Sequence, residues 1–281
     1  MRDSQTAKLR YYSGIIRPFY NFKAVKFKLF GRRIQSLAIP GKAYSLAVLW
    51  WQMRIFNNWA AVFTAYMFKR PLSSIYLNNG WQIHLSTHPA DVATVALIFC
   101  KQDYGKDFAG KSIIDIGANI GAFSIFAALQ GARKVISIEP SQESFDLLTR
   151  NIAANGLEHI ITPLQHVVTS SDGQVLKFPS KSSPNNKLSV KGTSEGFTDV
   201  TSITLDTLSS YCDNRINILK IDCEGGEYDI LQNQRDFSII PEIRMELHGS
   251  NNDKSKLIAY LKNKGYSIPQ HSSDNIWLTQ Y

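Results

Sequence analysis

The sequence contains little cysteine and no long apolar run. Its three cysteines, Cys100, Cys212 and Cys223, lie far apart and form no C-x-x-C pair. We therefore expect neither a disulfide scaffold nor a cysteine-rich zinc site, and a reduced cytoplasmic setting is predicted. The longest apolar stretch, residues 43–53, is too short to span a bilayer and is followed by Arg54. Basic residues interrupt the N-terminal region, so no signal peptide is predicted.

Acidic residues are nearly absent from the first 80 positions, where 13 Lys and Arg residues accompany the single acid Asp3. The rest of the 281-residue chain is slightly acidic, because the whole chain has a net charge of only +8. Aromatic side chains are interspersed among the charges between positions 11 and 33. This asymmetry predicts a basic, aromatic N-terminal helical extension over residues 1–70 and a larger domain over residues 71–281.

Three roles for this extension remain open, because composition does not separate them. It could be a solvated amphipathic cap that packs on the larger domain. It could contact anionic lipid headgroups, which would bring a cytoplasmic protein to the inner face of the membrane. It could also bind an acidic substrate or a nucleic acid.

Apolar and polar residues alternate in blocks from residue 111 onward. Short apolar runs predict strands, and the amphipathic stretches between them predict helices. Such alternation is typical of an α/β fold with a mostly parallel sheet that helices cover on both faces. The predicted strands are 112–116, 135–138, 160–168, 174–178, 216–221 and 243–247, and the predicted helices are 122–129, 141–154, 227–233 and 253–263.

The flanking segments are assigned from local patterns. Helices are expected within residues 43–68, and a hairpin is expected around the turn Asn78-Asn79-Gly80. Residues 179–200 are rich in Ser, Asn, Lys and Gly, which predicts a surface loop. The last two apolar runs, 266–268 and 275–278, are predicted to form an antiparallel pair of strands.

The strongest candidate for a ligand site is the segment DIGANIG at positions 115–121, between a predicted strand and a predicted helix. Glycines at such a turn let a ligand approach the backbone closely. A dinucleotide fingerprint has a glycine where Asn119 stands, and the charge of Asp115 would oppose a pyrophosphate. A carboxylate at a strand end instead suits a ligand with a cationic centre and an ammonium group. S-adenosylmethionine carries both.

An acidic residue, Glu139, ends the next predicted strand, 18 residues after Gly121. An acid at this point can accept hydrogen bonds from both ribose hydroxyls of an adenosine group. The glycine loop, the helix and this second acid therefore together predict a site for an adenosine-containing ligand.

A second polar cluster, KIDCEGGE at positions 220–227, follows the predicted strand 216–221. Asp222 and Glu224 are two residues apart on a turn, so both can face the same cleft. They could deprotonate an acceptor hydroxyl, hold a divalent metal or orient a methyl donor. Glu227 instead fits the first turn of a helix, where acids interact favourably with the helix macrodipole.

A third candidate, His248, lies in the sequence ELHG at the end of the predicted strand 243–247. Imidazole titrates near neutral pH, which suits a general base for a hydroxyl. A structural histidine is the alternative interpretation. Its position at a strand end beside the other two clusters supports a catalytic role.

The three clusters together resemble the FkbM family of S-adenosylmethionine-dependent methyltransferases. The matching stretches are IIDIGANIGAFSIFAA (113–128), ISIEPSQESFDLLTRNIAANG (136–156), ITLDTL (203–208), ILKIDCEGGEYDIL (218–231) and IRMELHG (243–249). The resemblance covers about residues 75–281. It implies a Rossmann-like seven-stranded methyltransferase sheet with helices on both faces, preceded by the basic extension, which has no clear counterpart in the family.

The resemblance also implies roles for individual residues. The residues implied to bind S-adenosyl-L-methionine are Asp115, Gly117, Asn119 and Gly121 at the methionine end, Glu139 at the ribose and Val167 near the adenine. Asp222 and Glu224 would lie beside the transferred methyl group. The candidate catalytic residues are therefore Asp222, Glu224 and His248, and no metal ligand is assigned.

We expect an O-methyltransferase that transfers the methyl group to a hydroxyl of a sugar, a glycolipid or another natural product. The alternatives are a nucleic-acid methyltransferase and a non-catalytic S-adenosylmethionine-binding protein. The basic extension favours the nucleic-acid alternative, but the chain has no N-P-P-[YF] tetrapeptide of amino-methylating enzymes. A nicotinamide-dependent oxidoreductase is disfavoured by the missing middle glycine.

Overall fold

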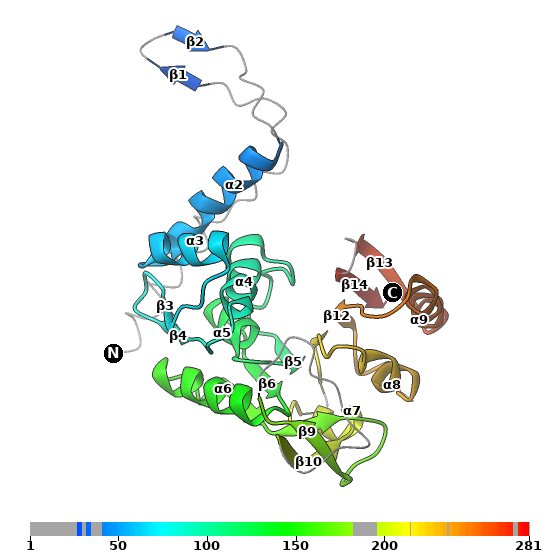
Figure 1. The fold of residues 1–281 in the computed structure, drawn as a ribbon. Coiled ribbons are helices and arrows are strands. Elements are labelled where there is room, and N and C mark those ends of the chain that lie inside the picture. The colour runs from blue at the N-terminus through cyan, green and yellow to red at the C-terminus, as the bar shows by residue number, and fades with distance from the viewer. Residues whose placement is uncertain are drawn as a thin grey trace.

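The computed structural model describes residues 27–29, 32–34, 41–181, 196–213, 215–234, 236–271 and 275–280 (Figure 1). Most of the predicted basic and aromatic segment before residue 41 lies outside the described residues, as does most of the predicted loop 179–200. None of the helices described is long and apolar enough to cross a membrane.

A seven-stranded sheet forms the centre of the structure, with the strand order β13-β14-β12-β11-β5-β6-β7. Neighbouring strands from β7 to β12 run parallel, whereas β14 runs antiparallel to both β12 and β13. The strands are β5 (Ser112–Ile116), β6 (Lys134–Ile138), β7 (Ile161–Leu164), β11 (Ile218–Ile221), β12 (Glu242–Glu246), β13 (Tyr266–His271) and β14 (Asn275–Gln280). This arrangement confirms the predicted Rossmann-like methyltransferase sheet and the antiparallel pair at its end.

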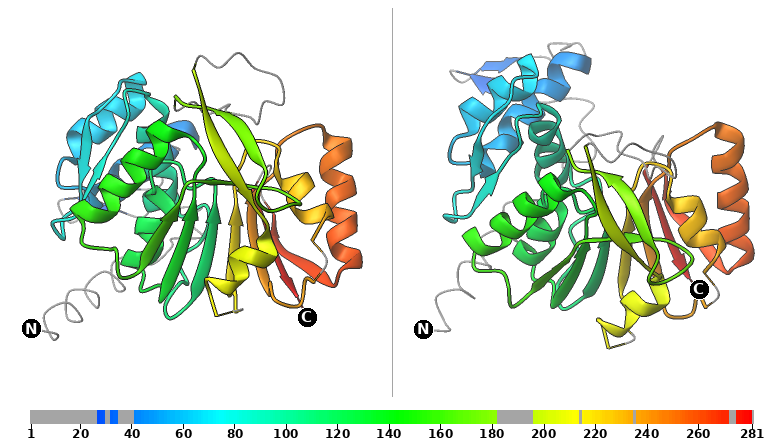
Figure 2. Two further views of the ribbon diagram at one scale, coloured as in Figure 1. Left: turned by 90° about the horizontal axis from the view of Figure 1, so that it is seen from below. Right: turned by 60° about the horizontal axis from the view of Figure 1, so that its bottom comes forward.

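Helices cover both faces of the sheet, as Figure 2 shows. The side chains of a strand alternate between faces, so Ile113 and Ile114 of β5 belong to different apolar cores. The core that contains Ile113 includes residues of α4 (Ala90–Ala96), α5 (Ala122–Leu129) and α6 (Gln142–Ala154). The core that contains Ile114 includes residues of α7 (Leu205–Ser210), α8 (Glu227–Gln232) and α9 (Asn251–Asn263). The predicted parallel sheet with two covered faces is therefore confirmed.

Helices and a hairpin from the N-terminal part share the first of these cores. They are α2 (Gly41–Gln52), the 3-10 turn η1 (Met53–Ile55), α3 (Trp59–Phe68), β3 (Ser74–Tyr76) and β4 (Gln82–His84). The predicted hairpin is confirmed, because β3 and β4 pair antiparallel. Two amides of α6 hold this hairpin: Asn151 Oδ1 accepts from the His84 N–H at 2.7 Å, and Asn155 Oδ1 accepts from the Gln82 N–H at 2.8 Å. Strands β1 (Phe27–Leu29) and β2 (Arg32–Ile34) also pair antiparallel, so the prediction that the extension 1–70 is helical is wrong at these residues.

Two local predictions are wrong. The apolar run 160–168 forms two strands instead of one: β7 stays in the large sheet, while β8 (His166–Val168) pairs with β10 (Phe197–Ile203) in a separate three-stranded sheet. The predicted loop 179–200 contains the start of β10, which also pairs with β9 (Val175–Pro179). Both errors have one cause. The residues of β10 pair with residues that precede them by 18 to 35 positions, and tertiary contacts that a local pattern does not contain set this pairing.

Candidate functional site

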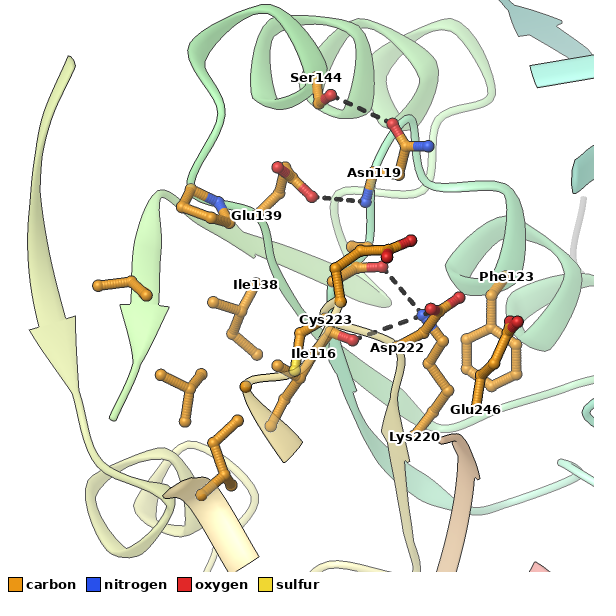
Figure 3. A pocket seen from close by; sticks show the side chains of 18 of the residues that line it. Ile116, Asn119, Phe123, Ile138, Glu139, Ser144, Lys220, Asp222, Cys223 and Glu246 are labelled. Carbon is orange, nitrogen blue, oxygen red and sulfur yellow. Dashed lines mark hydrogen bonds and ion pairs between the residues drawn. The ribbon is translucent and has the colours of Figure 1, made fainter. Parts of the chain in front are cut away.

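A cavity of about 580 Å³ lies at the carboxyl ends of β5, β6 and β11. This is the edge at which open α/β sheets bind ligands, and the volume is within the usual range for a small-molecule site. Figure 3 shows Glu139 and Asn119 on one side of the cavity and Lys220, Asp222 and Phe123 on the other. The predicted site residues that line it are Gly117, Asn119, Glu139, Val167, Asp222 and Glu224.

The glycine loop between β5 and α5 is pressed against the loop that follows β11. Gly117 has a positive φ of 75°, and a Cβ atom there would collide with the backbone carbonyl of Asp222. Asn119 also has a positive φ, 49°, a conformation that asparagine tolerates better than most residues. Asparagine can therefore adopt the backbone conformation required at position 119, where a dinucleotide fingerprint has a glycine. Gly121, at φ 87°, is the N-cap residue of α5 and is not among the residues that line the cavity.

Asp115 lies behind the cavity wall and does not line the cavity itself. Its side chain is completely buried. One carboxylate oxygen, Oδ2, accepts a 2.6 Å hydrogen bond from Ser124 Oγ, and Oδ1 lies 3.0 Å from the ammonium of Lys220. The charge of Asp115 thus faces Lys220, which does line the cavity.

The carboxylate of Glu139 is held by two backbone N–H groups. Oε2 accepts from Asn119 at 2.8 Å, and Oε1 accepts from Ser141 at 2.9 Å. Burial raises the pKa of Glu139 to about 7, although both hydrogen bonds oppose this shift. An ionised carboxylate has about four lone-pair sites, so each oxygen can still accept a further donor such as a ribose hydroxyl.

Apolar side chains also line the cavity. They come from the ends of β5 and β6 and from the small sheet of β8, β9 and β10. The apolar lining residues there are Ile116, Ile138, Val167, Val168 and Phe178. A flat heteroaromatic ring fits such a surface, so the residues present suit an adenosine group next to Glu139.

Asp222 is oriented by a residue that the sequence pattern did not single out. Tyr104, which follows the π-helical turn η2 (Leu97–Lys101), donates a 3.0 Å hydrogen bond from its hydroxyl to Asp222 Oδ2. Burial and the nearby carboxylates, Asp222 first among them, raise the pKa of Tyr104 well above its usual value, so it remains a donor. No motif marked Tyr104, because it lies 118 positions before its partner.

His248 is held by the buried carboxylate of Glu227. Oε1 of Glu227 accepts the backbone N–H of His248 at 2.7 Å and lies 3.3 Å from its Nδ1 atom. The Nε2 atom lies 3.6 Å from Oε2 of Glu224 and 3.9 Å from Oε1 of Glu246. The contact with Glu227 raises the pKa of His248 to about 9, with Glu224 and Asp222 adding to the effect. Glu227 also accepts a hydrogen bond from the N–H of Gly225 at 2.8 Å. Its role is therefore not limited to the predicted one in the first turn of α8, because it also holds the loop before that helix.

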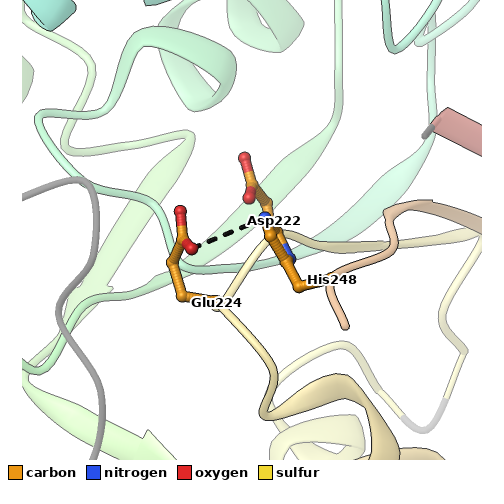
Figure 4. Close-up of side chains that lie close together, drawn as sticks. All are labelled: Asp222, Glu224 and His248. Carbon is orange, nitrogen blue, oxygen red and sulfur yellow. Dashed lines mark ion pairs between the residues drawn. The ribbon is translucent and has the colours of Figure 1, made fainter. Parts of the chain in front are cut away.

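The three candidate catalytic residues come together at one place, as Figure 4 shows for Asp222, Glu224 and His248. One ligand atom from each lies within 4.8 Å of the others. Among the residues described, this set could hold a divalent metal ion, since carboxylate oxygens and imidazole nitrogens both bind such ions. The same set could equally accept a proton from a bound hydroxyl.

The family comparison identifies the domain that contains this cavity. The sequence matches the model of the methyltransferase FkbM domain over residues 115–268, which is more than half of the chain. The chain is similar to methyltransferase sdnD of Sordaria araneosa, with 24% identity over 196 residues that cover 58% of this chain and 76% of that protein. It is also similar to methyltransferase 1 of Beauveria bassiana (strain ARSEF 2860), with 21% identity over 185 residues that cover 58% and 74% of the two chains.

Two solved structures are similar over part of the chain. A ribosomal protein L11 methylase from Lactobacillus delbrueckii subsp. bulgaricus has a TM-score of 0.37 and 16% identity, and the match covers 61% of this chain and 70% of that one. TrmK of M. capricolum, in complex with S-adenosyl-homocysteine, has a TM-score of 0.37 and 14% identity, and the match covers 60% of each chain.

Proposed function

This chain belongs to the FkbM family of S-adenosylmethionine-dependent methyltransferases (EC 2.1.1.-), and from that premise we propose that it methylates a hydroxyl of a sugar, a glycolipid or another natural product. When bound, S-adenosylmethionine supplies a methyl group on a cationic sulfur. A base of this chain would take the proton of the acceptor hydroxyl as its oxygen receives that methyl group, and the sulfur would be left neutral. What this chain must supply is therefore position, exclusion of water and a proton acceptor.

The observation that carries the proposal is the pair of contacts that Glu227 makes with the backbone N–H and with the Nδ1 atom of His248. The carboxylate faces Nδ1, which leaves Nε2 directed toward the group of Glu224 and Asp222 at the cavity. A base oriented by a buried carboxylate recurs in enzymes that deprotonate hydroxyls. We assign proton removal to Nε2 of neutral His248, and the orientation of the acceptor to Asp222 and Glu224. Because the pKa of His248 is about 9, the neutral form is a minor one at pH 7, and the rate should rise with pH up to about 9.

The charge of the cavity supports an acceptor without a phosphate backbone. Lys220 is the only lysine or arginine among the lining residues, whereas six lining residues are acidic. The acids are Asp103, Glu139, Asp222, Glu224, Asp229 and Glu246. Such a surface repels phosphate groups, so we place the nucleic-acid alternative second.

We also propose that the N-terminal part of the chain contacts a membrane surface. Two large aromatic side chains of its helices are well exposed: Trp51 at 64% and Phe68 at 70%. Each lies near a guanidinium group, Arg54 near Trp51 and Arg70 near Phe68. Exposed rings beside basic groups suit an anionic bilayer interface. Trp51→Ser with Phe68→Ser should reduce flotation with phosphatidylserine vesicles, and unchanged flotation would refute this contact.

Labelled methyl transfer tests the proposed reaction. The full chain would be incubated with S-adenosylmethionine that carries a tritiated methyl group and with sets of glycans, lipid-linked sugars and hydroxylated natural products. We expect label in an O-methyl ether, and loss of at least about 100-fold in rate for His248→Ala. His159→Ala is the matched control, because His159 is exposed and precedes the amino end of β7, whereas the cavity lies at the carboxyl ends of the parallel strands. Label on nucleic acid instead, or an unchanged rate in His248→Ala, would contradict the proposal.

A further inference from the structure

Lys220 is a buried cation at the centre of the site. It belongs to β11, lines the cavity and is only 3% exposed. Its ammonium nitrogen lies 3.0 Å from Asp115 Oδ1 and 3.9 Å from Asp222 Oδ2. It also donates a 2.9 Å hydrogen bond to the backbone carbonyl of Gly117. One side chain therefore joins β5, the glycine loop and the loop after β11.

Two aromatic rings also lie near this ammonium. The nitrogen lies 5.5 Å from the ring centre of Tyr104 and 5.8 Å from that of Phe123. Tyr104 in turn donates its hydroxyl to Asp222, so the ring and the carboxylate are fixed together. Burial alone would lower the pKa of Lys220, but Asp115 and Asp222 outweigh it and the pKa is raised, so the ammonium is charged at neutral pH.

The protons of this ammonium are directed at the protein. Gly117 and Asp115 lie at 2.9 and 3.0 Å, and a longer bond of 3.4 Å reaches the carbonyl of Ile116. Three partners match the three N–H groups of a lysine. Lys220 therefore does not donate a hydrogen bond to a bound ligand. It acts on the ligand by holding Gly117 and Asp115 in place and through its charge, whose electrostatic interactions are stronger in surroundings of low dielectric constant.

We propose that Lys220 is a positioning residue for methyl transfer. It holds the glycine loop through Gly117, and its charge balances Asp115 and Asp222, the two carboxylates that would otherwise bind the sulfonium too tightly. The methyl donor carries a positive sulfur, and the demethylated product S-adenosylhomocysteine does not. Unbalanced carboxylates would stabilise the donor over the product and over a transition state that is losing this charge, which would slow the reaction. Lys220 thus sets the ratio of the affinities for the two forms of the cofactor.

Calorimetric titration of the full chain with S-adenosylmethionine and with S-adenosylhomocysteine tests this role without an acceptor. In Lys220→Met, the ratio of the donor Kd to the product Kd should fall about tenfold, because the negative charge is no longer balanced. In Asp115→Asn, the same ratio should rise about tenfold, because Lys220 then keeps an uncompensated charge. Lys220→Arg, which retains the charge, should stay within about threefold of the unmodified chain.

The two opposite shifts separate an electrostatic role from a structural one. A purely structural lysine would weaken both ligands together and leave the ratio unchanged in every variant, which would overturn the proposal. If Lys220→Met does not fold, Asp115→Asn and the double variant Lys220→Met/Asp115→Asn still test the proposal. The double variant removes one positive and one negative charge, so it should restore the original ratio of the donor Kd to the product Kd. A chain that binds neither ligand in its unmodified form would instead refute the cofactor assignment and with it this proposal.

Discussion

Glu227 holds His248 at two points, since one carboxylate oxygen accepts the backbone N–H of His248 at 2.7 Å and lies 3.3 Å from its Nδ1 atom. The carboxylate is completely buried, so the imidazole faces a charge with little competing solvent. The end of β12 and the start of α8 are joined by this contact. It also fixes which nitrogen of the imidazole remains available to a substrate.

Removing the charge of Glu227 should lower the pKa of His248. We expect Glu227→Gln to bring this pKa from about 9 back toward the ordinary value of 6.5, because its largest cause is lost. The histidine ring signals in an NMR titration would report it. Glu246→Gln is the control, since Glu246 lies farther away, 3.9 Å from Nε2, and should change the pKa less. An unchanged pKa in Glu227→Gln would refute the role given to this carboxylate.

The contact between Glu227 and His248 also predicts how the free energy of unfolding depends on pH. The folded pKa of His248, about 9, lies above the unfolded value of 6.5. Its contribution to stability is therefore complete below about pH 6.5 and is lost as the pH rises through about 9, up to about 3 kcal/mol in all. Urea unfolding at pH 6 and pH 9.5 would measure the loss. Glu227→Gln should show a smaller difference between the two pH values, and an equal difference would contradict this account.

Cofactor affinity should depend on the ionisation of Glu139. Burial raises the pKa of Glu139 to about 7, so lowering the pH from 8 to 6 protonates an oxygen that would accept a ribose hydroxyl. We expect the affinity for S-adenosylhomocysteine to fall several-fold over this range in calorimetric titration. In Glu139→Gln the affinity should be weaker, by about tenfold, and should not vary with pH over the same range. An equally steep pH dependence in that variant would assign the effect to another group.

Adding a methyl group at Gly117 should disrupt the site. Gly117→Ala forces the loop after β11 to move, because the new Cβ would collide with the carbonyl of Asp222. Gly173→Ala is a close control, since Gly173 has nearly the same φ, 76° against 75°, with nothing within 4 Å of the added atom. Both variants share the cost of the left-handed conformation, on the order of 1 kcal/mol. Only Gly117→Ala should also lose binding of S-adenosylhomocysteine by calorimetry, and equal binding by the two variants would contradict the close approach.

Much of the fold could be predicted from the sequence because the decisive patterns are local. The alternation of Ile113 and Ile114 between two cores, and the strand-to-helix turn at 115–121, both depend on neighbouring residues. The split of 160–168 into two strands could not be predicted in this way. It depends on whether a distant strand, β10, is present to pair with His166–Val168.

The residues of the candidate site also fall into those that local sequence patterns predict and those that they do not. Asp222, Glu224 and His248 follow strand ends and were predicted. No role was predicted for Tyr104 or for Lys220, although Lys220 begins the motif 220–227, because Asp222 lies 118 positions from Tyr104 and Gly117 lies 103 positions from Lys220. Lys220 lies inside an apolar strand, where the pattern gives no reason to expect a charge network. Asp115 was predicted to line the methionine end, and in the structure its carboxylate instead faces Lys220 behind the cavity wall. Its contact with the cofactor stays a prediction.

The most direct test of the account is a calorimetric titration of the full chain with S-adenosylhomocysteine, with NAD as a parallel ligand and Glu139→Ala as a variant. We predict micromolar binding of S-adenosylhomocysteine, no binding of NAD, and at least tenfold weaker binding in Glu139→Ala. Binding of NAD alone, or undiminished binding in Glu139→Ala, would contradict the assignment of this cavity to an adenosine group held by Glu139.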